Sequence, residues 1–301
     1  MNKLFFLLAF SVFAFQHQAY AQGCSDAGVC TMESFKPSLK FDNELHNKNQ
    51  IKIGVSTGKA DHEISVLAGY LSYVRNINDS WTIDAKLTGI SQKGNGFSNS
   101  GLSDVFLNAN YALTENSGIS FGVKLPLSQA DGKQNGLDLP MDYQSSLGTV
   151  DILLGYAQKI SNWQFVLGFQ QPIIQNKNAF VNDLDFPDFS QAFHTTNQFK
   201  RAGDVLLRVS YPFALSNKLS FTPSLLPIYH LANDKYTYID TEYEIKGSSG
   251  LTLNANAYFD YNINASNALQ LSVGAPLVVR DLRPDGLTRS FVATLEYSFK
   301  F

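Results

Sequence analysis

Apolar and polar residues alternate along most of the chain from residue 50 onward, and the last twelve residues show the pattern most clearly. In residues 290–301 every odd-numbered position, from Phe291 to Phe301, is apolar or aromatic, and the even-numbered positions are polar except for Val292. Because successive side chains of a β-strand point to opposite faces, the pattern predicts a strand with one apolar and one polar face. Such a strand suits a membrane barrel, in which one face meets lipid and the other meets the lumen.

Twelve segments with this alternation are predicted as strands, although the facing of the second segment is ambiguous. They cover residues 50–57, 62–75, 81–90, 102–113, 118–127, 148–159, 162–174, 202–213, 218–229, 250–262, 267–280 and 290–301. Alternation sustained over segments of about ten residues is typical of transmembrane barrels. The sequence therefore predicts an all-β fold, an antiparallel transmembrane β-barrel of about 12 strands formed by residues 50–301.

The connections between these segments alternate in length. Short turns are predicted near 76–80, 114–117, 160–162, 214–217 and 263–266, and longer connections near 91–101, 128–147, 175–201, 230–249 and 281–289. The first hairpin, at 58–61, is the exception, because it lies on the long side and is short. This sorting indicates short periplasmic turns, longer extracellular loops and both termini in the periplasm. A secreted β-sandwich, the rival fold, gives no reason for such sorting.

Aromatic residues flank the short turns on the apolar face. They are Trp81, Tyr111, Tyr156, Trp163, Tyr211 and Tyr261. Trp and Tyr prefer the boundary between membrane and water, where the ring is half buried and the polar tip stays hydrated. We therefore expect these residues to form the periplasmic girdle of the barrel.

The N-terminus predicts export. Residues 1–21 combine Lys3, an apolar run of twelve residues from Leu4 to Phe15, and the sequence Ala-Tyr-Ala before Gln22. This is the pattern of a secretory signal peptide, and the run is shorter than the roughly 20 apolar residues of a spanning helix. With the barrel prediction, it indicates the outer membrane of a Gram-negative bacterium.

Residues 22–49 are predicted to form a periplasmic N-terminal segment. Cys24 and Cys30 are the two cysteines of the chain, and an oxidising periplasm favours a disulfide between them. Lipidation of Cys24 is the weaker alternative. Two interpretations of the segment stay open, since it could plug the lumen from below or remain a loose periplasmic tail.

Composition argues against several functional classes. Without its signal peptide the chain has 22 basic and 26 acidic residues, a net charge of −4, which predicts no nucleic-acid partner. His46, His62, His194 and His230 lie outside any His-x-Ser pair, and the sequence has no Gly-x-Ser-x-Gly, His-Glu-x-x-His or phosphate-loop motif. The chain is therefore predicted to be no enzyme and to need no cofactor or metal ion.

Charged residues on the predicted inner face are the candidate solute-path residues. Strand parity places Asp84, Lys86, Lys124, Arg208 and Glu296 in the lumen, and Asp104, Asp151 and Asp204 inside near the outer rim. One interpretation is that these charges select a solute and that the rim aspartates attract cations. The other is that the charges pair with one another to brace the barrel and that each rim aspartate hydrogen-bonds backbone where a loop ends.

The rim aspartates belong to a recurring pattern. It reads Gly-Leu-Ser-Asp at 101–104, Gly-Thr-Val-Asp at 148–151 and Gly-Asp at 203–204. Together with Phe-Gly-Val-Lys-Leu-Pro at 121–126 and Leu-Gly-Thr at 147–149, it resembles the outer-membrane transporter-like family named after a protein of the phenol meta-degradation pathway. The resemblance spans about residues 80–301. It implies a barrel that helps small, often hydrophobic or aromatic molecules across the outer membrane, and it supplies no catalytic residues.

The predicted function is passive passage of a small solute, hydrophobic and aromatic molecules included. Outer-membrane lipid, the barrel insertion machinery and the small-molecule solute are the expected partners. The alternative is a closed structural or adhesive barrel that acts through its extracellular loops. The loops near 175–201 and 230–249 are rich in Phe and Tyr, respectively, so we expect them either to fold over the mouth as a lid or to pack only on themselves.

Overall fold

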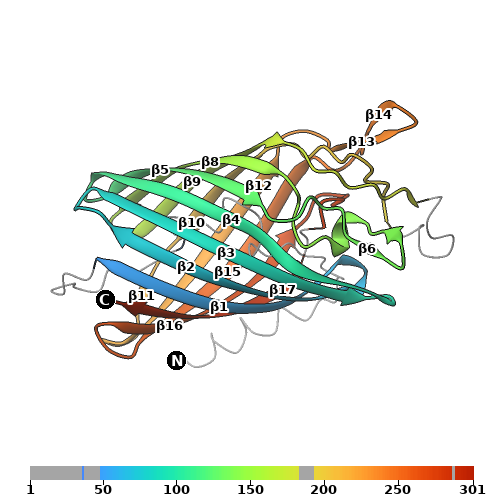
Figure 1. Ribbon diagram of the computed structural model, residues 1–301. Coiled ribbons are helices and arrows are strands. Elements are labelled where there is room, and N and C mark those ends of the chain that lie inside the picture. The colour runs from blue at the N-terminus through green and yellow to red at the C-terminus, as the bar shows by residue number, and fades with distance from the viewer. Residues whose placement is uncertain (1–35, 37–47, 183–192, 287–288) are drawn as a thin grey trace, which may run out of the picture.

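The computed structural model describes residue 36 and residues 48–182, 193–286 and 289–301. Twelve antiparallel strands form a closed barrel (Figure 1). They are β1 (Asn49–Ala60), β2 (Ser65–Asn76), β3 (Trp81–Gly94), β4 (Phe97–Thr114), β5 (Ser117–Pro126), β8 (Val150–Ile160), β9 (Trp163–Ile174), β10 (Asp204–Ser210), β12 (Leu219–His230), β15 (Gly250–Asn262), β16 (Asn267–Val278) and β17 (Arg289–Lys300). The prediction of about 12 strands is confirmed.

The barrel closes by pairing its first strand with its last. Gln50 of β1 lies opposite Lys300 of β17, and the register continues to Lys59 opposite Phe291. The remaining neighbours follow the order of the chain. A short strand, β11 (Phe213–Ala214), continues the line of β10 beyond Pro212 and pairs with β12. Because proline has no N–H for the ladder, the interruption at this point has a local cause.

Side chains on each strand alternate between lipid and lumen as the pattern predicts. On β17, Phe291 and Leu295 are 48% and 55% exposed, whereas Val292 and Glu296 are 7% and 4% exposed. The same alternation on the other strands gives the barrel an apolar outer surface. A continuous apolar surface of this extent is stable only against lipid, so the barrel spans a membrane.

The predicted aromatic girdle is present at the end of the barrel that carries the short turns. There the rings of Trp81 and Tyr111 lie 4.9 Å apart, and those of Trp163 and Tyr211 lie 5.1 Å apart. Trp81 and Trp163 begin β3 and β9 directly after short turns, whereas Tyr111 lies on β4 and Tyr211 follows the last residue of β10.

One predicted long connection is wrong. Residues 91–101 were expected to form a loop, but β3 and β4 continue to a two-residue turn at Asn95 and Gly96, where φ is +51° and +80°. Asn-Gly favours this tight hairpin because both residues accept positive φ. The strand residues between positions 91 and 100 are mostly polar on both faces. The alternation of apolar and polar residues therefore stops in this segment, although both strands continue through it. Figure 1 shows this hairpin reaching the loop end of the barrel.

The four long loops, 127–149, 175–203, 231–249 and 279–288, gather at the outer end. Two small strand pairs lie within them, β6 (Lys133–Gln134) with β7 (Leu137–Asp138) and β13 (Lys235–Tyr238) with β14 (Thr241–Glu244). The part of the chain that the structure describes also has two short 3₁₀ turns, η4 (Asp61–Glu63) and η5 (Met141–Tyr143). Within the described residues, no helix has the length and apolar composition needed to cross a membrane.

The loops pack on one another through apolar side chains. One cluster joins Leu139, Tyr143, Phe180 and Phe193 to the outer ends of β1 to β3, and a second joins Met141, Leu147, Phe199 and Ile245. Residues 139–149 are all buried, so loop 127–149 folds into the mouth rather than away from it. The described aromatic residues of loop 175–203, Phe180, Phe193 and Phe199, thus pack against loop 127–149 and the outer ends of the first strands and not only against their own loop. Residues 183–192, which include Asp183, Asp185 and Asp188, lie outside the described part of the chain.

Candidate functional site inside the barrel

Six strands carry a continuous row of polar side chains on the inner wall near the outer end. The row, here called the outer belt, is Asp104, Lys124, Asp151, Gln170, Asp204 and His230, from β4, β5, β8, β9, β10 and β12. Register places Lys124 opposite Asp151, and Asp204 opposite both Gln170 and His230. All six side chains are buried.

The rim aspartates are held by neighbouring donors. Lys124 Nζ lies 3.0 Å from Asp151 Oδ2 and donates a 2.8 Å hydrogen bond to Thr149, while Gln170 donates to Asp151. Asp104 accepts hydrogen bonds from Ser103 and Ser146 (2.6 and 2.7 Å). Buried ions are tolerated when their charge is compensated in this way. The Lys124–Asp151 pair is of the kind that the bracing interpretation describes, but the donors to Asp104 are side-chain hydroxyls, where that interpretation expected backbone. Ser146 and Thr149 also tie loop 127–149 to the belt.

The loops extend the belt with four further charged residues, Arg201, Asp234, Arg280 and Asp285. Together with Asp204 and His230, these residues form what we call the clasp. Arg201 pairs with Asp204 at 2.6 Å, and the His230 ring lies between Asp204 and Asp234, 2.7 and 2.8 Å from their oxygens. Arg280 and Arg201 both contact Asp285. The clasp joins three long loops to β10 and β12.

Electrostatics within the clasp favour the charged forms. Burial by itself raises the pKa of Asp285, but Arg280 and then Arg201 outweigh it and hold the pKa below its usual range. Burial likewise lowers the pKa of Arg201, but Asp204 and Asp285 outweigh it, so that the guanidinium stays protonated. The opposite charges around Asp285 and Arg201 thus stabilise the ionised forms of these two residues.

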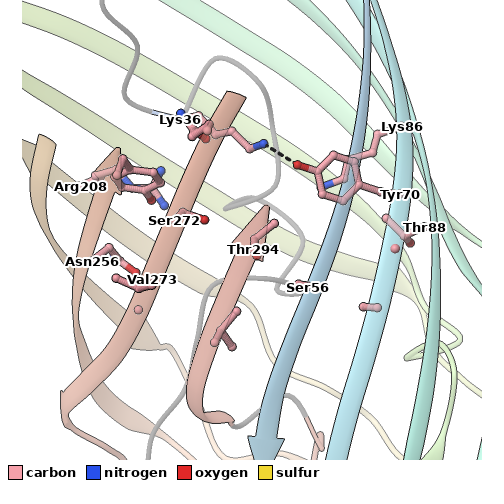
Figure 2. Close-up of a pocket in the computed structure, with 16 residues that line it drawn as sticks. Lys36, Ser56, Tyr70, Lys86, Thr88, Arg208, Asn256, Ser272, Val273 and Thr294 are labelled. Carbon is pink, nitrogen blue, oxygen red and sulfur yellow. Dashed lines mark hydrogen bonds between the residues drawn. The ribbon is translucent and has the colours of Figure 1, made fainter. Parts of the chain in front are cut away.

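Farther inside, a polar cavity is lined by residues of β1, β2 and β3 on one side and of β10, β15, β16 and β17 on the other. Figure 2 shows Tyr70 and Lys86 on one wall and Arg208 and Asn256 on the opposite wall. The lining residues surround about 740 Å³ of empty space, counting the part that is open to solvent. Lys86 Nζ lies 4.0 Å from the centre of the Tyr70 ring. We call this space the lumen cavity.

A compact contact group centres on Glu296 of β17. Its carboxylate accepts hydrogen bonds from Tyr70 and Lys36, and Lys52 Nζ lies 3.6 Å from it. Lys36 also donates to the Tyr70 hydroxyl at 3.2 Å (Figure 2). Lys36 belongs to the predicted N-terminal segment, residues 22–49, and lies inside the barrel. The predicted Cys24–Cys30 disulfide and the signal peptide lie outside the described residues.

All eight candidate solute-path residues face the interior and are buried, but they fall into separate groups. They are Asp84, Lys86, Asp104, Lys124, Asp151, Asp204, Arg208 and Glu296. The structure brings Lys86 and Arg208 to one cavity and Lys124 to Asp151. Asp84 lies two residues before Lys86 on the same face of β3, and it accepts hydrogen bonds from Asn108 and Asn110 (2.6 and 3.1 Å).

Sequence reasoning missed two groups of residues. Tyr258 and Asn256 could have been found, because they occupy the inward positions of a clearly alternating strand, and the facing of Tyr70 was ambiguous. The clasp residues Arg201 and Asp285 lie in loops, where no periodic pattern indicates their partners.

The barrel has an apolar inner patch as well. Inward side chains of β4, β8, β9, β10 and β12 form a buried cluster of Phe106, Leu153, Val166, Leu206, Leu226 and Ile228. Leu206 and Arg208 lie two residues apart on the same face of β10, so the patch adjoins the lumen cavity. The interior thus offers both a polar and an apolar surface, and the apolar patch lies next to the outer belt on the same strands.

Comparison with known proteins finds solved structures of similar fold but assigns the chain to no family. No family model matches the sequence, and no curated protein matches it. Solved barrels resemble the fold at low identity. The KdgM porin is 7% identical over 84% of this chain and 99% of its own, with a TM-score of 0.44. The CymD monoaromatic hydrocarbon channel is 9% identical over 85% and 89%, with a TM-score of 0.43. The translocator domain of the autotransporter NalP from Neisseria meningitidis is 9% identical over 86% and 90%, with a TM-score of 0.45.

Proposed function

We propose that this chain is inserted into the outer membrane of a Gram-negative bacterium by the barrel insertion machinery and passes a small solute passively. The observation that carries the proposal is the lumen cavity, a polar space inside a closed wall whose outer face is apolar. Eight-stranded barrels are filled by side chains, and those of 16–18 strands hold wide channels. Twelve strands give an intermediate, narrow conduit.

The two-sided interior fits a solute with polar and apolar parts. The lumen cavity offers cations, amides and hydroxyl groups, and the inner patch around Phe106 and Leu153 offers apolar contact. Hydrophobic and aromatic molecules that carry one polar group satisfy both sides. This agrees with what the resemblance to the phenol meta-degradation family implies.

Loop 127–149 is the proposed constriction. Ser146 and Thr149 anchor it to Asp104 and Lys124 of the outer belt, and its buried residues lie in the mouth. A solute that moves between the lumen cavity and the outside must pass the gap beside this loop or displace it. Passage is therefore expected to be narrow and selective by size.

Reconstitution tests the proposal. The purified barrel in planar bilayers should produce discrete conductance steps, and liposomes that contain it should release small solutes faster than protein-free liposomes. Heat-unfolded protein from the same preparation is the control. Absence of both conductance and release for every solute tried would refute passage and leave the fold unaffected.

A closed adhesive barrel is the second candidate, and the β13–β14 hairpin is the observation in its favour. This hairpin projects beyond the other loops (Figure 1), and Tyr236 and Tyr243 stack on it with ring centres 5.6 Å apart. Replacing residues 236–243 by a short Gly-Ser turn separates the candidates. Loss of surface binding without change in conductance would favour adhesion, whereas unchanged binding would count against it.

A further inference from the structure

Charged groups from one strand and three loops surround the His230 ring at the outer end of the barrel. The ring is buried at the last residue of β12. Its Nδ1 lies 2.7 Å from Asp204 Oδ1, and its Nε2 lies 2.8 Å from Asp234 Oδ1. Both ring nitrogens therefore face a carboxylate oxygen. The charged clasp residues around the ring are Asp204 on β10, Arg201 in loop 175–203, Asp234 in loop 231–249, and Arg280 and Asp285 in loop 279–288.

The two carboxylates that face the ring also have other donors. Asp204 Oδ2 lies 2.6 Å from an Arg201 nitrogen. Asp234 Oδ1 accepts a 2.9 Å hydrogen bond from the backbone N–H of Ala202. An ionised carboxylate only accepts hydrogen bonds, whereas a neutral imidazole has a single N–H. The two ring contacts therefore need His230 as the imidazolium, with a proton on each nitrogen.

Charge balance in the clasp depends on that second proton. With the imidazolium, the cations Arg201, Arg280 and His230 match the carboxylates of Asp204, Asp234 and Asp285. Without it, the clasp has one excess negative charge, and a lone pair of the ring points at a carboxylate oxygen. A buried charge that has lost its compensation is strongly unfavourable.

Asp234 is the less firmly held of the two carboxylates that face the ring. Its Oδ2 makes no hydrogen bond and lies 3.7 Å from an Arg280 nitrogen, whereas Asp204 keeps its close Arg201 partner. When the ring loses a proton, the contact between His230 and Asp234 is therefore the one expected to break. That contact joins loop 231–249 to the barrel wall.

Asp234 is linked directly to the packing of the mouth. Its carbonyl oxygen accepts a 2.8 Å hydrogen bond from the Ile245 N–H. Ile245 packs with Met141 and Leu147 of loop 127–149, the proposed constriction. Movement of Asp234 away from the wall would therefore loosen the apolar cluster that holds the constriction in the mouth.

We propose that His230 is a pH-sensitive latch, which holds loop 231–249 against the mouth when its ring is protonated and releases this loop when the ring is neutral. The proposal rests on the proposed function, because it names a regulation of the same conduit.

The direction of the pH effect follows from the chemistry of the ring. Among the clasp groups, only the imidazole has an ordinary pKa near neutrality, about 6.5. The contacts of the imidazolium are therefore complete below that value and are lost as the ring gives up its proton at higher pH. The mouth should be more closed in mild acid than in alkali.

Single-channel conductance in planar bilayers between pH 5 and pH 10 tests the latch. The wild type should change from a lower to a higher conductance as pH rises. H230Q, which carries no charge at any pH, should show the higher conductance throughout. D234N removes one of the two carboxylates and should move the transition about 1–3 pH units lower, the usual effect of one neighbouring charge. H194Q alters an exposed histidine of loop 175–203 and should keep the wild-type transition.

Hydrogen–deuterium exchange gives a readout that does not depend on conduction. At pH 6, amides of loop 231–249 should exchange faster in H230Q than in the wild type, and those of the short turn at 263–266 should exchange alike. Each variant is first checked for the shift in gel migration that a folded barrel shows on heating. If H230Q does not fold, the wild type and D234N across the same pH series still decide.

The outcomes separate the latch from the conduit. Equal exchange of loop 231–249 in wild type and H230Q, or a conductance transition that persists unchanged in H230Q, overturns the latch and leaves the proposed function standing. A barrel that conducts at no pH overturns the proposed function. Faster loop exchange in H230Q would in that case still support the latch as a closure of the outer loops.

Discussion

The ring of Tyr70 lies directly over the backbone of Gly54 on the neighbouring strand. A Cβ built on Gly54 would come within 2.2 Å of the ring, and the two residues are paired in the register of β1 and β2. The missing side chain lets the ring lie flat across the strand, an arrangement in which an aromatic residue covers a strand glycine. That position brings the Tyr70 hydroxyl to Glu296 on β17. The missing side chain of Gly54 on β1 thus allows Tyr70 of β2 to contact Glu296 of β17, where the barrel closes.

Substituting Gly54 by alanine should displace the Tyr70 ring and break its hydrogen bond to Glu296. We expect the free energy of unfolding to fall by about 1–3 kcal/mol, the usual cost of overpacking. Urea unfolding in detergent measures the change. Gly69→Ala is the matched control, because the nearest atom to its Cβ would be 3.6 Å away, an ordinary contact. Equal losses in the two variants would contradict this account.

Removing Lys124 should be far more costly than removing an exposed lysine. K124M leaves Asp151, which is fully buried, without its cation, and we expect a loss of about 3–5 kcal/mol in unfolding free energy. The double variant K124M/D151L should recover most of that loss, because no buried charge remains. K133Q breaks the exposed pair with Asp138 and should cost at most about 1 kcal/mol. The prediction fails if K124M and K133Q unfold alike.

The proposed constriction depends on Gly286. This residue has φ of +65°, and a Cβ there would lie 2.6 Å from both Asp142 Cα and the Met141 carbonyl oxygen. Gly286→Ala should push loop 127–149 out of the mouth and raise single-channel conductance. Gly136→Ala carries the same backbone penalty of about 1–2 kcal/mol at φ +81° but meets no atom within 4 Å. It should therefore leave conductance unchanged, and a rise in both variants would rule out the clash as the cause.

Acid should weaken the clasp through Asp285. The folded-state pKa of this carboxyl lies below its unfolded value of about 3.9. Its stabilisation is therefore complete above that unfolded value and is lost as pH falls through the folded pKa. Urea unfolding should be measured between pH 7 and pH 2. Above about pH 5, Asp285 should add no pH dependence to the free energy of unfolding, and at lower pH that free energy should fall. D285N should be less stable at neutral pH, and the difference from the wild type should shrink in acid.

Strand parity was sufficient to predict most of the barrel wall from the sequence. It predicted correctly that Glu296 and Arg208 point inward. With lipid on one face and the polar lumen on the other, apolar and polar residues must alternate along each strand. It failed at Asn95 and Gly96, where both strands extend into water and both faces become polar. Alternation therefore identifies the part of a strand that faces lipid and misses the part that extends into water.

The sequence did not predict which side chains contact one another inside the barrel. Arg201 and Asp285 are 84 residues apart and meet because two loops fold toward each other. Lys86 and Arg208 line one cavity because of the curvature of the barrel, which no local pattern encodes. Alternation fixes which way a side chain points, whereas its height and its opposite neighbour depend on the register of every intervening strand.

The pairing of β1 with β17 determines when the barrel can be completed. β1 and β17 are the first and last strands of the barrel in chain order, so one edge of each strand stays unpaired until the two strands meet. Unpaired edges invite association with other chains, and contacts so distant in sequence form slowly. Before that contact forms, the barrel is an open sheet with two exposed edges, and the pairing of β1 with β17 is the step that turns this sheet into a closed cylinder.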